Sequence, residues 1–95
     1  MGSAICSVDG IIQGTDLPFA ILHGFQPDEL MGSPLAGLIA PHCRGELPLH
    51  LQIARRRGSH MFPSIHRTRT GGEFPVEVSL LIEAGTVRYG VQGAA

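Results

Sequence analysis

The clearest alternation of apolar and polar positions runs through residues 74–82. The apolar residues fall on every second position: Phe74, Val76, Val78, Leu80 and Ile82. The positions between them are Pro75, Glu77, Ser79 and Leu81. Successive side chains of a β-strand point to opposite faces, so this pattern predicts a strand with one buried face and one partly exposed face.

Two further strands are predicted beside this one. Residues 62–70 favour a strand, and the pair Gly71-Gly72 that follows supplies the glycines of a tight hairpin turn. Gly85 ends the central strand, and the alternation then resumes at Val87, Tyr89 and Val91. The C-terminal half is therefore predicted to be a meander of three antiparallel strands.

The N-terminal residues predict a hairpin of their own. Residues 4–8 favour a strand, residues 11–13 favour a second one, and Asp9-Gly10 between them is among the strongest two-residue turn signals. This hairpin needs another sheet to cover its apolar side chains. We expect it to share one sheet with the C-terminal meander.

The middle of the chain predicts several short helical segments. Residues 17–22 follow Asp16, a favoured helix cap, and residues 26–32 carry proline and two acids at their start and glycine at their end. Ser33 is expected to cap a third turn. The inward-facing residues of that turn are predicted to be Leu35, Leu38 and Ile39.

The longest predicted helix covers residues 46–57. Its apolar stripe is formed by Leu47, Leu51 and Ala54, and three arginines precede the glycine that ends it. The predicted fold is α+β, with a five-stranded antiparallel sheet covered on one face by these helices. A small cavity is expected between the sheet and the helices.

Composition limits the classes of partner and compartment. The 95 residues suffice for one domain, and seven arginines, no lysine and eight acids give a net charge of −1, which favours neither nucleic acid nor a membrane surface. Cys6 and Cys43 lie far apart without Cys-x-x-Cys spacing, so a reduced, cytoplasmic protein is expected. No apolar run approaches the about 20 residues that a membrane-spanning helix needs.

Signatures of catalysis are missing from the sequence. It contains no Gly-x-Ser-x-Gly turn for a nucleophile, and a chain without lysine cannot build the usual phosphate-binding P-loop. The histidines and cysteines of the middle region show no spacing typical of a closed zinc site. We therefore expect a non-catalytic protein without a structural metal.

Several segments, taken in order, resemble the PAS family of sensory domains. Residues 8–12 look like its opening hairpin, and residues 19–32 are similar to its helix, Gly-aromatic and acidic-Leu-x-Gly signature. Residues 38–41 resemble the segment before its long helix. Residues 67–79 are similar to its arginine-bearing strand, its turn and its Phe-Pro-x-Glu-x-Ser strand.

The sequence also departs from the family pattern. Asp16 stands where the family usually has asparagine, Gly71 replaces the usual aspartate in a turn one residue shorter, and the Asp-Ile-Thr exit motif is missing. The resemblance implies that residues 1–95 are a single PAS domain with its output domain outside this sequence. Such modules are usually one piece of a larger histidine kinase, PAS-domain kinase, regulator or chemoreceptor.

The resemblance raises two cofactors for the expected cavity. Flavin-binding members need a cysteine near the position of Leu35 and use asparagines, which this chain lacks, although Gln92 lies on a strand similar to the one that carries their flavin-facing glutamine. Haem-binding members carry a histidine on the long helix. The matching position is Leu47, and His50 is its neighbour on the same helix face.

The candidate cavity residues are therefore His50, Leu47, His66 and Gln92. His66 lies on the strand opposite the long helix, and His23 ends the first helix. The expectation is no cofactor, with haem as the leading alternative and flavin disfavoured. Two function classes stay open: a sensor that binds a ligand in the cavity, and a scaffold whose cavity is filled by its own side chains.

A docking surface is expected on the other face of the sheet. Apolar residues assigned to that face are Cys6, Val8, Leu81 and Tyr89. An exposed apolar patch usually marks a partner site. We therefore predict a homodimer, or a partner bound through the sheet.

Overall fold

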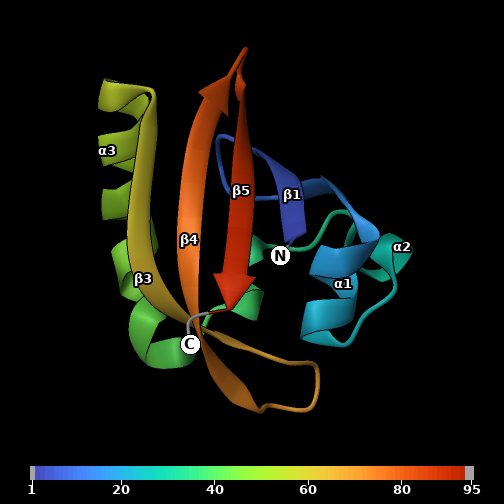
Figure 1. The fold of residues 1–95 in the computed structure, drawn as a ribbon. Helices are drawn as coiled ribbons and strands as arrows, with labels where there is room; N and C mark the ends of the chain where they lie inside the picture. The colour runs from blue at the N-terminus through green and yellow to red at the C-terminus, as the bar shows by residue number, and fades with distance from the viewer. Residues whose placement is uncertain (1, 94–95) are drawn as a thin grey trace.

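A computed structural model describes residues 2–93 of the chain. Five antiparallel strands form one sheet in the order β2-β1-β5-β4-β3 (Figure 1). The strands are β1 (Gly2–Ser7), β2 (Ile12–Thr15), β3 (Ser59–Arg67), β4 (Glu73–Glu83) and β5 (Thr86–Gly93). Because β1 pairs with β5, the N-terminal hairpin and the C-terminal meander share one sheet, as predicted.

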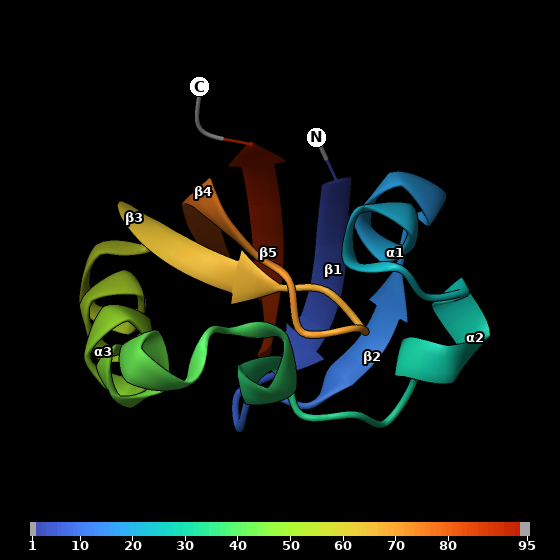
Figure 2. The same cartoon turned by 90° about the horizontal axis from the view of Figure 1, so that it is seen from below.

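The segments between β2 and β3 are helical. They are α1 (Leu17–His23), α2 (Pro27–Leu30), the 3-10 turns η1 (Leu35–Leu38) and η2 (Pro41–Glu46), and α3 (Leu47–Arg57). Figure 2 shows α3 beside β3 at one edge of the curved sheet, and α1 and α2 beside β2 at the other edge. The predicted α+β architecture is confirmed.

The ends of the helices largely follow the predicted signals. The Phe19 amide donates to Asp16 Oδ1 at 2.9 Å, and Gly24 ends α1 with a φ of 85°, which favours glycine. The prediction that Ser33 caps the third turn is wrong, since η1 begins after Pro34 with no side-chain cap. Ser33 instead uses its carbonyl to accept from the Ile12 amide of β2.

The core lies between the sheet and the helical segments. Strands β4 and β5 contribute Val76, Val78, Leu80, Val87, Tyr89 and Val91, all at most 2% exposed. The prediction that Cys6 and Tyr89 lie on the outer face is wrong. Cys6 shares the inward parity of Ala4, and Tyr89 shares that of Val87, so both side chains are buried.

Candidate functional site

Three buried polar side chains form a continuous chain of hydrogen bonds through the core. His23 comes from the end of α1, His66 from β3 and Tyr89 from the central strand β5. His23 Nε2 lies 2.8 Å from His66 Nδ1, and His66 Nε2 lies 2.9 Å from the Tyr89 hydroxyl. His23 Nδ1 lies 2.8 Å from the Phe19 carbonyl oxygen. The polar chain thus joins a helix to two strands.

The bond between His23 and the Phe19 carbonyl sets the direction of the other two hydrogen bonds. A carbonyl oxygen only accepts, so His23 Nδ1 must carry its hydrogen and donate to Phe19, which leaves Nε2 of the neutral ring as an acceptor. His66 Nδ1–H therefore donates to His23. The second nitrogen of His66 then accepts from the Tyr89 hydroxyl. Every polar group in the chain has a partner when all three side chains are neutral.

Burial keeps the three groups neutral. Desolvation lowers the pKa of His66 to about 3, with a smaller contribution from the neighbouring His23. Desolvation also lowers the pKa of His23, although its bond to the Phe19 carbonyl acts in the opposite direction. Burial raises the pKa of Tyr89 above its ordinary value, and the nearby Cys6 adds to this effect. The polar chain is therefore uncharged near neutral pH.

Aromatic and sulfur-containing side chains surround the polar chain. The His23 ring lies 4.5 Å from the Phe19 ring and 5.6 Å from the Phe74 ring, measured between centroids. Burial raises the pKa of the Cys6 thiol to about 11, so Cys6 remains protonated near neutral pH. The polar chain thus lies among the packed side chains of the core, and the small cavity that the sequence predicted stays a prediction.

The four predicted cavity residues lie in different places. His66 is fully buried in the polar chain, and Leu47 is buried in the core at the start of α3. Gln92 is exposed on the outer face of β5, away from the interior. His50 is half-buried and lies outside the polar chain. The structure therefore does not bring these four residues together, and their role in binding a cofactor stays a prediction.

His50 belongs to a separate cluster between α3 and β3. Its ring stacks on Phe62 with 3.7 Å between centroids and an interplanar angle of 2°, and its Nδ1 lies 3.0 Å from His60 Nε2. Its pKa is lowered by partial burial and then by His60, and Glu46, 3.9 Å away, opposes this. Among the residues that the structure describes, no group of three or more His, Cys, Asp or Glu side chains could hold a metal ion.

Sequence reasoning missed that His23, His66 and Tyr89 act together. His66 has the same parity on β3 as the buried Phe62, which identifies it as an inward-facing histidine. A buried imidazole needs a partner, and the inward-facing Tyr89 hydroxyl is one. The sequence alone does not show that His23 pairs with His66, because 43 residues separate them.

The outer face of the sheet is hollowed at its centre. A depression of about 520 Å³ is lined mainly by outward-facing residues of β3, β4 and β5 together with the start of β1. Gly90 and Ser79 both line it, and a side chain at position 90 would clash with Ser79, since an added Cβ would lie 2.6 Å from Ser79 Oγ. Met61 and Leu81 on its border are 64% and 43% exposed.

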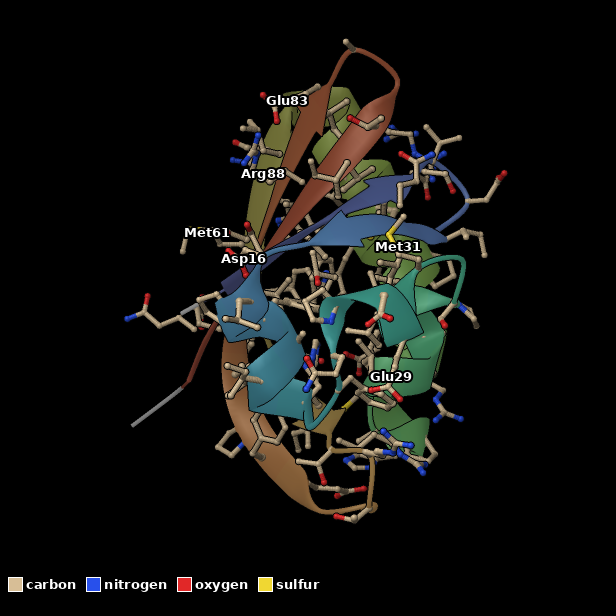
Figure 3. All side chains as sticks on the ribbon, turned by 90° about the vertical axis from the view of Figure 1, so that its right-hand side faces the viewer. Asp16, Glu29, Met31, Met61, Glu83 and Arg88 are labelled. Atoms are coloured by element: carbon tan, nitrogen blue, oxygen red, sulfur yellow. The ribbon has the colours of Figure 1, made fainter. Side chains whose placement is uncertain are left out.

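Charged groups frame this hollow. Arg88 Nε donates to Glu83 Oε1 at 2.9 Å, and Asp16 and Glu77 also line the hollow. Figure 3 shows Asp16, Met61, Glu83 and Arg88 toward one side of the molecule, whereas Glu29 and Met31 lie toward the other. The outer face therefore combines exposed apolar side chains with charges of both signs.

Comparisons with known proteins identify the fold. No family model and no curated protein matches the sequence. The structure is similar to the PAS domain of a protein from Colwellia psychrerythraea, with a TM-score of 0.88 and 13% identity, covering 98% of this chain and 85% of that one. It is also similar to the PAS domain of an HTR-like protein from Haloarcula marismortui, with a TM-score of 0.83 and 18% identity, covering 98% and 80%.

A third similar structure is the PAS domain of the Cronobacter turicensis RpfR quorum-sensing receptor in complex with BDSF. Its TM-score is 0.84 at 14% identity, and the match covers 99% of this chain and 93% of that one. The chain therefore has the PAS fold, as the sequence motifs predicted. Within residues 2–93, we also find no helix that is both long enough and apolar enough to span a bilayer.

Proposed function

We propose that the chain is a non-catalytic PAS module of a signalling protein, which acts by docking the outer face of its sheet onto a second copy of itself. The observation that supports this proposal most directly is the hollow on the outer face of the sheet, with the exposed Met61 in its lining. The interior, where a ligand would otherwise bind, is occupied by packed side chains. This favours the scaffold over the ligand sensor.

The shape of the outer face suits a second copy. A two-fold interface uses the same surface on both partners, so that surface must carry a projection and a matching recess. Met61 supplies a flexible apolar projection, and the hollow that Ser79 and Gly90 line supplies the recess. In a symmetric pair, each Met61 would enter the hollow of the partner.

The charges on this face are compatible with the same arrangement. Arg88 lines the hollow and forms an ion pair with Glu83, and Glu77 lies on the same face of β4. Charges of both signs allow two identical surfaces to meet without like charges facing one another throughout. A partner surface with charges of mainly one sign would be repelled either by the acidic side chains or by Arg88.

Sedimentation velocity tests this proposal. We expect wild-type protein to form dimers at high micromolar concentration and Met61→Glu to shift it to monomers, because the substitution places a charge at the centre of the interface. Met31→Glu is the matched control, since Met31 is 54% exposed on another part of the molecule and should leave the dimer intact. A monomeric wild type, or equal loss of dimer in both variants, would contradict the proposal.

A second candidate is a sensor of a small ligand in the core. One structure of the same fold is described as a PAS domain in complex with ethanol, from a LuxR-family regulator, and another in complex with BDSF. A ligand that entered the core would have to replace one of the hydrogen bonds within the polar chain, which lies between apolar walls. Histidine NMR signals that shift on addition of ethanol would favour this candidate, and absorption in the haem or flavin bands of the purified protein would favour a cofactor.

A further inference from the structure

The polar chain in the core suggests chemistry beyond docking. Tyr89 is the only tyrosine of the sequence, and the chain contains no tryptophan. Its hydroxyl is fully buried and donates to one histidine, which in turn donates to another. A phenol held against an imidazole acceptor can lose an electron and a proton together, because the imidazole takes the proton that the oxidised phenol no longer holds.

We propose that Tyr89 is a one-electron redox site whose hydroxyl proton is taken by His66 and passed on to His23. The oxidant is a diffusible one-electron acceptor, such as a reactive oxygen or nitrogen radical. It accepts one electron from the Tyr89 ring and is reduced by that electron. This redox site does not depend on the docking of the outer face.

The proton movements balance within the chain. The Tyr89 O–H bond breaks and its proton joins His66 Nε2, while the His66 Nδ1–H bond breaks and that proton joins His23 Nε2. The products are a neutral tyrosyl radical, a neutral His66 of the opposite tautomer, and a His23 ring protonated on both nitrogens. One electron has left the protein, and the proton has stayed inside it.

Every polar atom keeps a partner after this transfer. His66 Nε2–H then donates to the Tyr89 oxygen, His23 Nε2–H donates to His66 Nδ1, and His23 Nδ1–H still donates to the Phe19 carbonyl. The two bonds of His66, at 2.8 and 2.9 Å, are only reversed in direction, and the bond to the Phe19 carbonyl is unchanged. No buried donor or acceptor is orphaned, so the reaction needs no rearrangement of side chains.

The proton transfer leaves a positive charge at the end of a helix. The positive charge arises on His23, the last residue of α1, where burial opposes a cation and the Phe19 carbonyl and the carbonyl end of the helix favour it. Oxidation at the central strand β5 therefore changes the charge where a helix meets the sheet. The domain measures 21 Å along its shortest axis, so the buried ring lies within a short distance of solvent, where the oxidant arrives.

Flash photolysis tests the proposal with a defined oxidant. Ruthenium(III) tris(bipyridine), generated by a light flash with a cobalt(III) complex as the final electron acceptor, is mixed with the full chain, and the tyrosyl radical is followed by absorbance and electron paramagnetic resonance. We expect a neutral radical that forms at a rate independent of buffer base. A pH-indicator dye should detect no proton release while the radical persists. Tyr89→Phe should abolish the tyrosyl signal.

Two variants distinguish proton transfer through both histidines from proton transfer to His66 alone. His66→Phe removes the proton acceptor, so radical formation should slow by about 10²-fold, as when a positioned base is lost. His23→Gln keeps an oxygen that accepts from His66 Nδ1–H but cannot hold the proton, so its radical should form and then decay faster than that of the wild type.

Two results would overturn the proposal. One is release of one proton per radical from the wild-type protein, a measurement that needs no variant. The other is a wild-type rate no faster than that of the same chain unfolded in urea. Either result would leave the three side chains with a structural role only.

Discussion

His23 Nε2 lies 2.8 Å from His66 Nδ1, so two imidazoles that are 43 residues apart in the sequence share one hydrogen in the core. This contact ties the end of α1 to β3, and Tyr89 extends it to the centre of the sheet. Protonating both rings would place two N–H groups against each other. The pair is therefore stable only while at least one of the facing nitrogens is an acceptor.

The first prediction concerns stability at acid pH. The pKa of His66 is about 3 in the folded chain against an ordinary value of 6.5, so the unfolded chain binds the proton first as the pH falls. This contribution to stability is complete above pH 6.5 and is lost as the pH falls toward the folded value. We expect a loss of about 2 kcal/mol between about pH 6.5 and 5, measured by urea unfolding.

Asp16, Glu29 and His50 also have lowered pKa values, so their contributions must be separated from that of His66. The lowered pKa values of Asp16 and Glu29 matter only below their ordinary values of 3.8 and 4.5, outside this window. The pKa of His50 is also lowered, so His50→Gln serves as the control and should keep most of the slope. His66→Phe should reduce the slope and leave the part that comes from the lowered pKa of His23. A wild-type stability that does not change between about pH 7 and 5 would show that the two core histidines are not buried as neutral groups.

The second prediction is coupling between His66 and Tyr89. Tyr89→Phe leaves the His66 acceptor buried without a partner, which should lower the free energy of unfolding by about 1–3 kcal/mol. His66→Phe likewise leaves the Tyr89 hydroxyl buried without a hydrogen-bond partner. The double variant removes both polar groups, so we expect it to cost less than the sum of the single variants in a double-mutant cycle. Additive losses would indicate that the 2.9 Å contact does not stabilise the fold.

The third prediction uses the single tyrosine as its own probe. Burial raises the pKa of Tyr89, so the phenolate should not form at the pH where a free tyrosine ionises, at about 10. We expect its ultraviolet absorption to appear only when alkali unfolds the chain, in step with the loss of circular dichroism. Phenolate absorption that rises near pH 10 in folded protein would place the hydroxyl in contact with water.

The fold could be predicted because its signals are local. The inward positions of β4 are apolar one after another, and the caps at Asp16 and Gly24 mark the ends of α1 within a few residues. Tyr89 was harder to place, because a tyrosine fits either face of a sheet. Its parity with Val87 and Val91 is the stronger signal, and it points inward.

The polar chain and the hollow depend on contacts between segments that are far apart in the sequence. The partner of Tyr89 lies 23 residues away on a strand that is not adjacent to β5. The hollow on the outer face is lined by Gly90 and Ser79, which stand opposite one another, and that register is set by the hairpin between β4 and β5. Sequence periodicity gives the face of each residue, but not its neighbour on another strand.

The most direct test of the docking proposal is an isotope-filtered NMR experiment on a mixture of labelled and unlabelled chains. It detects only contacts between copies. We predict nuclear Overhauser effects from the Met61 methyl group of one copy to the Gly90 and Ser79 protons of the other, and none from Met31. Intermolecular contacts confined to Met31, or no intermolecular contacts at high micromolar concentration, would contradict it.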